Sequence, residues 1–159
     1  MRHVLNAAQR RGARTKLISG PLLQLPLYQP ENPERSEGAR FLVSELALAD
    51  GIVLGSPGYH GSISGLVKNA LDYAEDLRTD PRPYFSGRAV GCIATAGGWP
   101  GAVNTLGALR GWPTPLGAAI NAADQVFDAA GLCLVPRVAQ VLDLMAEEIL
   151  SFARSGAPR

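Results

Sequence analysis

Short apolar runs alternate with amphipathic stretches along this chain, and the alternation predicts an α/β fold. The runs Gly51 to Leu54 and Arg88 to Thr95 have few polar positions, which is typical of strands covered on both faces in a parallel sheet. Two weaker runs, Thr15 to Ser19 and Leu116 to Ile120, are further strand candidates. The pattern therefore predicts a parallel sheet of four strands.

Between these runs, apolar residues recur with the i, i+3, i+4, i+7 spacing of helices that pack on one face of a sheet. Helices are predicted over Met1 to Arg11, Pro33 to Ala49, Ile63 to Leu77, Ala102 to Arg110 and Pro136 to Phe152. They would cover both faces of the sheet in a three-layer αβα arrangement. A length of 159 residues fits one domain, residues 1–159.

The loop after the first apolar run, Ser56 to Ser62, is the strongest candidate site. In open α/β sheets, ligands bind beyond the carboxyl ends of the strands. Pro57 fixes its own φ, while Gly58 and Gly61 permit backbone geometry that other residues resist, so the loop can hold one shape against a flat ligand. Taken alone, such a loop is more often a plain connection between a strand and a helix.

A second glycine-rich turn, Ala96 to Trp99, follows the strand predicted at Arg88 to Thr95. A strand that ends in glycines and leads into a helix allows backbone N–H groups to approach a ligand closely. One such turn is a weak signal. Two of them after successive strands strengthen the hypothesis of a ligand site.

The run Ser56 to Tyr73, SPGYHGSISGLVKNALDY, resembles the second flavin-binding loop of the NAD(P)H-dependent FMN reductases. That family has a Pro-x-Tyr-(His/Asn)-Gly-Ser run leading into a Leu-Lys-Asn-x-Leu-Asp helix. The corresponding residues are Pro57, Tyr59, His60, Gly61 and Ser62, then Val67 in place of Leu, Lys68, Asn69, Leu71 and Asp72. The turn Ala96 to Trp99 resembles the third flavin-contacting loop of the same reductases.

The resemblance implies a flavodoxin-like fold, FMN as cofactor and NADPH or NADH as co-substrate. Hydride would pass from the nicotinamide to the flavin and on to a small-molecule acceptor, namely free flavin, a quinone or an azo compound. The chemistry would belong to the flavin, with no catalytic side chain. The implied flavin-binding residues are Ser56, Pro57, Gly58, Tyr59, His60, Gly61, Ser62, Ala96, Gly97, Gly98 and Trp99. A homodimer or homotetramer is expected.

His60 has two interpretations. An imidazole is the usual general acid or base near neutral pH. Hydride transfer between nicotinamide and flavin needs juxtaposition more than a protein acid, so a histidine that lines the flavin is favoured. Because His3 is the only other histidine, a histidine-rich metal site is excluded, and no metal is expected.

The resemblance fails at the N-terminus. The family has an earlier strand, followed by a Ser/Arg-rich loop that grips the FMN phosphate, and nothing in this sequence matches that loop. The helical stripe begins at Met1 without a capping residue. We therefore expect an N-terminally truncated form, with the absent strand lying between Thr15 to Ser19 and Gly51 to Leu54. A flavin-free remnant with a structural or interaction role is one alternative, and a flavodoxin-type electron carrier is another.

Composition narrows the list of partners. A net charge of +1 and a pI near 7.8 give no electrostatic reason to propose a nucleic acid or an anionic membrane, and flavodoxins are usually far more acidic. Cys92 and Cys133 lie in apolar runs, as expected of buried thiols in a reducing compartment. No apolar stretch approaches the ~20 residues of a membrane span. A cytoplasmic location is expected.

Overall fold

The structure, a computed structural model, describes residues 1–111, 116–121 and 125–155. Its centre is a sheet with the strand order β2-β1-β3-β4. The strands are β1 (Gly51–Tyr59), β2 (Ser62–Ile63), β3 (Ala89–Ala96) and β4 (Leu116–Asn121). β1, β3 and β4 run parallel, whereas the short β2 pairs antiparallel with the end of β1. The sheet is therefore parallel except for one hairpin at its edge.

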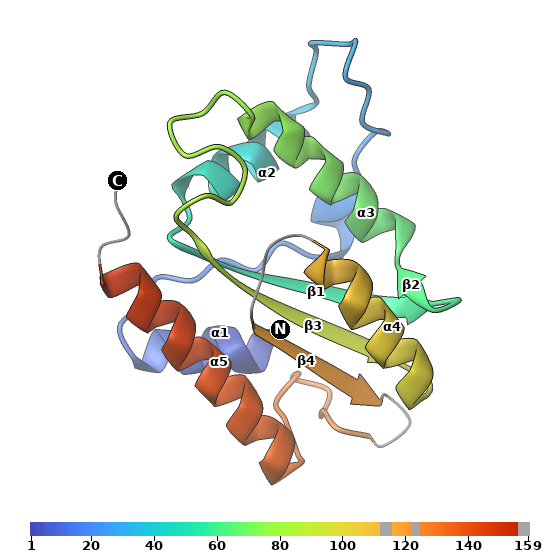
Figure 1. The fold of residues 1–159 in the computed structure, drawn as a ribbon, viewed down its shortest axis with the longest axis vertical. Coiled ribbons are helices and arrows are strands. Elements are labelled where there is room, and N and C mark those ends of the chain that lie inside the picture. Colours follow the sequence, from blue (N-terminus) through green and yellow to red (C-terminus); the bar gives the residue numbers. More distant parts are fainter. Residues whose placement is uncertain (112–115, 122–124, 156–159) are drawn as a thin grey trace.

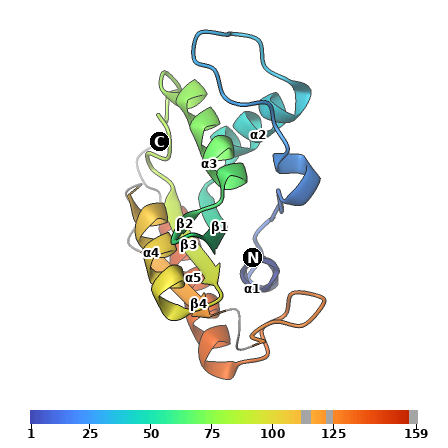
Figure 2. The same cartoon turned by 90° about the vertical axis from the view of Figure 1, so that its right-hand side faces the viewer.

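Helices cover both faces of this sheet (Figures 1 and 2). On one face, α1 (Arg2–Arg10) and α5 (Pro136–Arg154) pack against each other and contribute buried side chains such as Val4 and Leu142 to a core shared with Ile93 of β3. On the other face, α3 (Gly65–Asp72) and α4 (Trp99–Arg110) bury Leu71 and Leu109 against Leu54 and Cys92. The predicted three-layer α/β fold is confirmed.

The remaining elements form a smaller core beside the sheet. α2 (Glu37–Leu48) packs Ala39 and Leu42 against Ala70 and Tyr73, beside two short 3-10 turns, η1 (Gly20–Leu23) and η2 (Tyr73–Leu77). The prediction that this helix begins at Pro33 is wrong. Ser36 is the N-cap, and its hydroxyl accepts the N–H of Ala39 at 3.2 Å, so the helix begins only afterwards.

Three of the four predicted parallel strands are present, and the fourth is wrong. Thr15 to Ser19 forms no regular element. A strand is stable only when its backbone groups are paired, and no described residue pairs with this segment. Among the described residues, the edge of β1 that faces away from β3 pairs only with β2, at Gly58 and Tyr59. A two-residue hairpin strand thus takes the fourth place in the sheet.

The register between β1 and β3 brings two chain segments to one edge of the sheet. Pro57 lies level with Thr95, so both strands end at nearly the same height. The hairpin after β1 and the start of α4 consequently emerge side by side at the right-hand edge in Figure 1, and Figure 2 looks onto that edge. Among the described helices, none is long and apolar enough to cross a membrane.

Candidate functional site

The hairpin after β1 forms the first part of the site. Contrary to the prediction of a loop over Ser56 to Ser62, β1 continues to Tyr59, and β2 begins at Ser62. Only His60 and Gly61 form the turn, with φ of 53° and 78°. Two central residues with positive φ are typical of a type I′ turn, whose twist suits a two-residue hairpin. His60 therefore has a conformational role in shaping the tip.

Ser56 faces inward at the base of the hairpin. It is 4% exposed, and its hydroxyl accepts the N–H of Ser64 at 2.9 Å while donating to the carbonyl of Pro57 at 2.9 Å. Ser64 in turn caps α3, because its own hydroxyl accepts the N–H of Val67 at 3.3 Å. Of the residues predicted to bind flavin, Ser56 and Ala96 are buried in the protein.

Gly58 allows the hairpin to pack closely against α4. A side chain at Gly58 would overlap the hydroxyl of Thr105 and would lie 3.1 Å from the methyl group of Ala96. Thr105 is 0% exposed, and its hydroxyl lies 2.8 Å from the carbonyl of Gly101 and 3.3 Å from that of Ser62. Sequence reasoning missed Thr105, because nothing in a helical pattern marks which residue meets a distant glycine.

The outer surface of the two segments is open and partly aromatic. Tyr59 is 63% exposed and Trp99 is 56% exposed. A side chain at Gly97 would meet no atom within 4 Å, and one at Gly98 would approach only the ring of Pro100, at 3.9 Å. Of the remaining predicted residues of the hairpin, Pro57, His60 and Ser62 are exposed, and Gly58 and Gly61 are half-buried.

The chemistry of this surface suits a flat, uncharged ring. Residues 56–62 and 96–99 include no Asp, Glu, Lys or Arg. Exposed aromatic side chains stack on conjugated rings, and glycine backbone without a Cβ permits close approach. Gly98 is the N-cap of α4 and makes no side-chain capping bond there. In the described part of the chain, no group of His, Cys, Asp or Glu is arranged to hold a metal ion.

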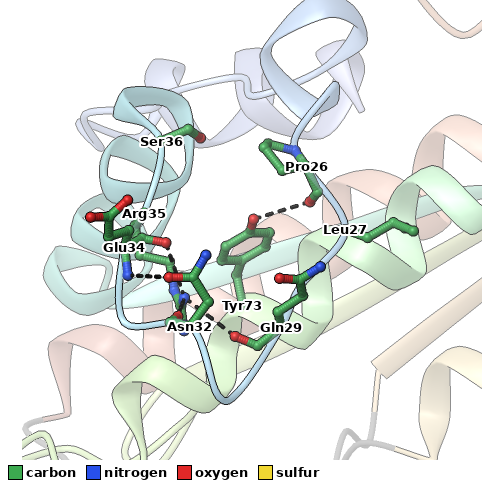
Figure 3. A pocket seen from close by; sticks show the side chains of 8 residues that line it. All are labelled: Pro26, Leu27, Gln29, Asn32, Glu34, Arg35, Ser36 and Tyr73. Atoms are coloured by element: carbon green, nitrogen blue, oxygen red, sulfur yellow. Dashed lines mark hydrogen bonds between the residues drawn. The ribbon is translucent and has the colours of Figure 1, made fainter.

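An open depression of about 360 Å³ lies elsewhere, between the loop from Pro26 to Ser36 and the ring of Tyr73 (Figure 3). Several of its polar groups are engaged within the protein. The Tyr73 hydroxyl donates to the carbonyl of Pro26 at 3.0 Å, and the Asn32 side chain accepts the N–H of Glu34 at 2.9 Å. The depression shares no residue with the surface at the carboxyl ends of β1 and β3.

Arg35 organises the loop around this depression. Its guanidinium donates to both carboxylate oxygens of Asp76, at 2.6 and 2.8 Å, and lies 4.9 Å from the ring centre of Tyr28. Because Arg35 donates these hydrogen bonds, the pKa of Asp76 lies below its ordinary value. Arg35 is thus committed to holding the loop.

The helical half of the family motif has a similar structural task. Asn69 accepts the N–H of Tyr28 at 2.9 Å and donates to the carbonyls of Leu25 and Pro26, at 3.3 and 2.9 Å. Lys68 pairs with Asp72 on the solvent side of α3. These two polar motif residues therefore contact the protein's own chain.

The sequence of this chain is similar to those of known FMN reductases and azoreductases. The sequence pattern of the NADPH-dependent FMN reductase family matches residues 1–131. An NADPH azoreductase from Bacillus sp. (strain OY1-2) is 32% identical over 121 residues, which cover 67% of this chain and 65% of that protein. An FMN-dependent NADPH-azoreductase from Staphylococcus aureus (strain USA300) is 39% identical over 84 residues, 52% of this chain and 42% of that protein.

Solved structures agree on the fold. FerB, a flavoenzyme NAD(P)H:(acceptor) oxidoreductase from Paracoccus denitrificans, superposes with a TM-score of 0.70 at 20% identity, covering 97% of this chain and 87% of that one. The apo form of an NADH:FMN oxidoreductase gives 0.50 at 20% identity, over 75% and 60%. The chain spans less than two thirds of the length of the curated relatives it matches. By the match over residues 1–131, this chain belongs to the NADPH-dependent FMN reductase family.

Proposed function

We propose that this chain binds FMN at the carboxyl ends of β1 and β3 and acts as an NAD(P)H-dependent FMN oxidoreductase. The observation that carries the proposal is the pairing of the hairpin with the turn Ala96 to Trp99, which the register of β1 and β3 brings to one edge. Family membership and the uncharged, partly aromatic surface support it. The ring of the flavin is the part of FMN that this surface suits.

Each surface residue would have a simple part in holding the ring. Tyr59 and Trp99 would lie against the ring, and the unobstructed backbone of Gly97 and Gly98 would allow it to approach closely. His60 would shape the tip of the hairpin. When bound, FMN supplies the redox chemistry, taking hydride from NADPH or NADH and giving it to free flavin, a quinone or an azo compound. The protein supplies orientation and an open face.

The test is a titration of the 159-residue chain with FMN, followed by quenching of flavin fluorescence. Gly97→Val is the decisive variant, because Gly97 is exposed and a Cβ there would meet no atom within 4 Å beyond its chain neighbours. We expect unchanged thermal stability and at least about tenfold weaker FMN binding, since a ring kept from contact loses more than one good interaction. Gly107→Val, at another glycine with open space around it, is the matched control and should bind FMN normally.

The outcomes separate the alternative functions. A chain that binds FMN and oxidises NADPH or NADH steadily is a reductase. FMN binding without nicotinamide oxidation would favour a flavodoxin-type electron carrier. No FMN binding by the wild-type chain would overturn the proposal and favour a flavin-free protein with a structural or interaction role.

A homodimer or homotetramer and a cytoplasmic location stay part of the proposal. The low cysteine content of the sequence, with Cys92 and Cys133 each in an apolar run, supports a reducing compartment. Light scattering coupled to size-exclusion chromatography tests the oligomer, and a strictly monomeric chain would contradict it.

A further inference from the structure

The hydroxyl of Thr105 lies where the two halves of the candidate site meet. Thr105 is on the second turn of α4, fully buried, and its hydroxyl reaches the carbonyl of Gly101 in its own helix at 2.8 Å and that of Ser62 in β2 at 3.3 Å. Gly101 belongs to the first turn of α4, the helix that begins at Trp99, and Ser62 belongs to the hairpin. One side chain therefore joins the hairpin to the first turn of α4.

The contact with β2 goes beyond what the helix alone requires. A threonine inside a helix commonly donates its hydroxyl proton to the carbonyl four residues earlier, which here is Gly101. A hydroxyl has only one proton, so the hydroxyl of Thr105 shares that proton between the carbonyls of Gly101 and Ser62. The hairpin approaches this closely because Gly58 has no side chain. The polar contact and the missing Cβ together fix the distance between the hairpin and α4.

We propose that Thr105 is a positioning residue, which sets the hairpin carrying Tyr59 against the start of α4, which carries Trp99. The effect of Thr105 on FMN binding rests on the function proposed above. Thr105 itself is buried and touches no ligand. Without its hydroxyl, the carbonyl of Ser62 loses a partner, and the hairpin is no longer held at one distance from α4. The two segments would still form the site, but the distance between them would vary. A site whose groups are not held in place binds its ligand weakly.

The experiment compares Thr105→Val, which keeps the shape and removes the hydroxyl, with Thr105→Ser, which keeps the hydroxyl. Two readouts are used: amide hydrogen exchange of residues 59–62 and 97–101 in the ligand-free chain, and the Kd for FMN. For Val we expect about tenfold faster exchange and about tenfold weaker FMN binding, the factor that one lost hydrogen bond gives. Ser should stay within about twofold of wild type, because the hydroxyl contact is kept.

Ser36→Ala is the matched control, because that hydroxyl caps α2 and makes no contact with either segment of the site. It should lower thermal stability without changing the exchange of residues 59–62 or the Kd. If Val behaves like Ser, or if its effect is only a global loss of stability like that of the control, the inference is overturned. If Val does not fold, Thr105→Ala replaces it with the same expectations.

Failure of the proposed function is distinguishable from failure of this inference. A wild-type chain that does not bind FMN removes the function. The exchange measurement on the ligand-free chain still decides whether Thr105 holds the hairpin. Normal FMN binding by both Thr105→Val and Thr105→Ala would leave the function in place and remove the positioning role.

Discussion

The hydroxyl of Ser56 accepts the backbone N–H of Ser64 at 2.9 Å, in the buried space between β1 and the start of α3. This bond joins two residues that are eight positions apart in sequence, and it closes the hairpin at its base. The hydroxyl of Ser56 is therefore part of the framework beneath the candidate site, and the predicted role of Ser56 in flavin binding stays a prediction.

Ser56→Ala should destabilise the chain by about 1–3 kcal/mol, because the N–H of Ser64 is then buried without a partner. Urea unfolding measures the loss. Ser64→Ala is the control: it removes the cap on Val67, worth about 1 kcal/mol, and leaves the N–H of Ser64 bonded. Equal stability of Ser56→Ala and wild type would show that water reaches the N–H of Ser64.

Gly58→Ala should be costly because the new methyl group overlaps the hydroxyl of Thr105. Overpacking of this kind costs about 1–3 kcal/mol. Gly65→Ala is the matched control, since its methyl group meets no atom within 4 Å at the start of α3 and should gain up to about 1 kcal/mol of helix propensity. Thermal unfolding of the two variants should move in opposite directions. A neutral Gly58→Ala would mean that the hairpin can lift away from α4.

Asp76→Asn should cost about 2 kcal/mol at neutral pH, because it removes the charged partner of Arg35. The pKa of Asp76 is lowered in the folded state by hydrogen bonds from Arg35. The stabilisation is therefore fully present above the ordinary aspartate pKa of about 3.9, and it is lost as the pH falls toward the lower folded value. The difference between wild type and variant should shrink below that ordinary pKa in a series of urea melts.

The control for this pair is Asp72→Asn. Asp72 pairs with the exposed Lys68 within one helix, and such surface pairs contribute about 0.5 kcal/mol or less. Its unfolding free energy should change little at any pH. A loss at Asp76 no larger than the loss at Asp72 would contradict the role given to Arg35.

Asn69→Ala should loosen the loop that begins at Leu25, because three hydrogen bonds to that loop are lost. Asn69→Asp should be worse, since a carboxylate keeps the bond from Tyr28 but faces two carbonyl oxygens that need a donor. Limited proteolysis between Leu25 and Asn32 measures the opening. Cleavage rates equal to that of the wild type would mean that Tyr73 and Arg35 suffice to hold the loop.

Much of the fold could be predicted because its signals are local. The apolar run at Gly51 to Leu54 and the helical stripe after Pro136 each depend on residues within a few turns of one another, and both elements are present. The strand expected at Thr15 to Ser19 was wrong because a strand also needs a partner, which no local pattern supplies. The flavin-binding roles of the hairpin and of the turn after β3 stay a prediction.

By itself, the sequence determined the layered α/β fold, its three parallel strands and the two glycine-rich segments at the carboxyl ends of β1 and β3. Only the tertiary structure decided which residues of those segments face inward. The hydroxyl of Ser56 bonds to Ser64, Gly58 packs closely against Thr105, and Tyr59 is exposed. The reason is physical. Hydrophobic periodicity is a property of each single element, whereas the direction of a side chain in a hairpin depends on the strand pairing and on the helix packed beneath it.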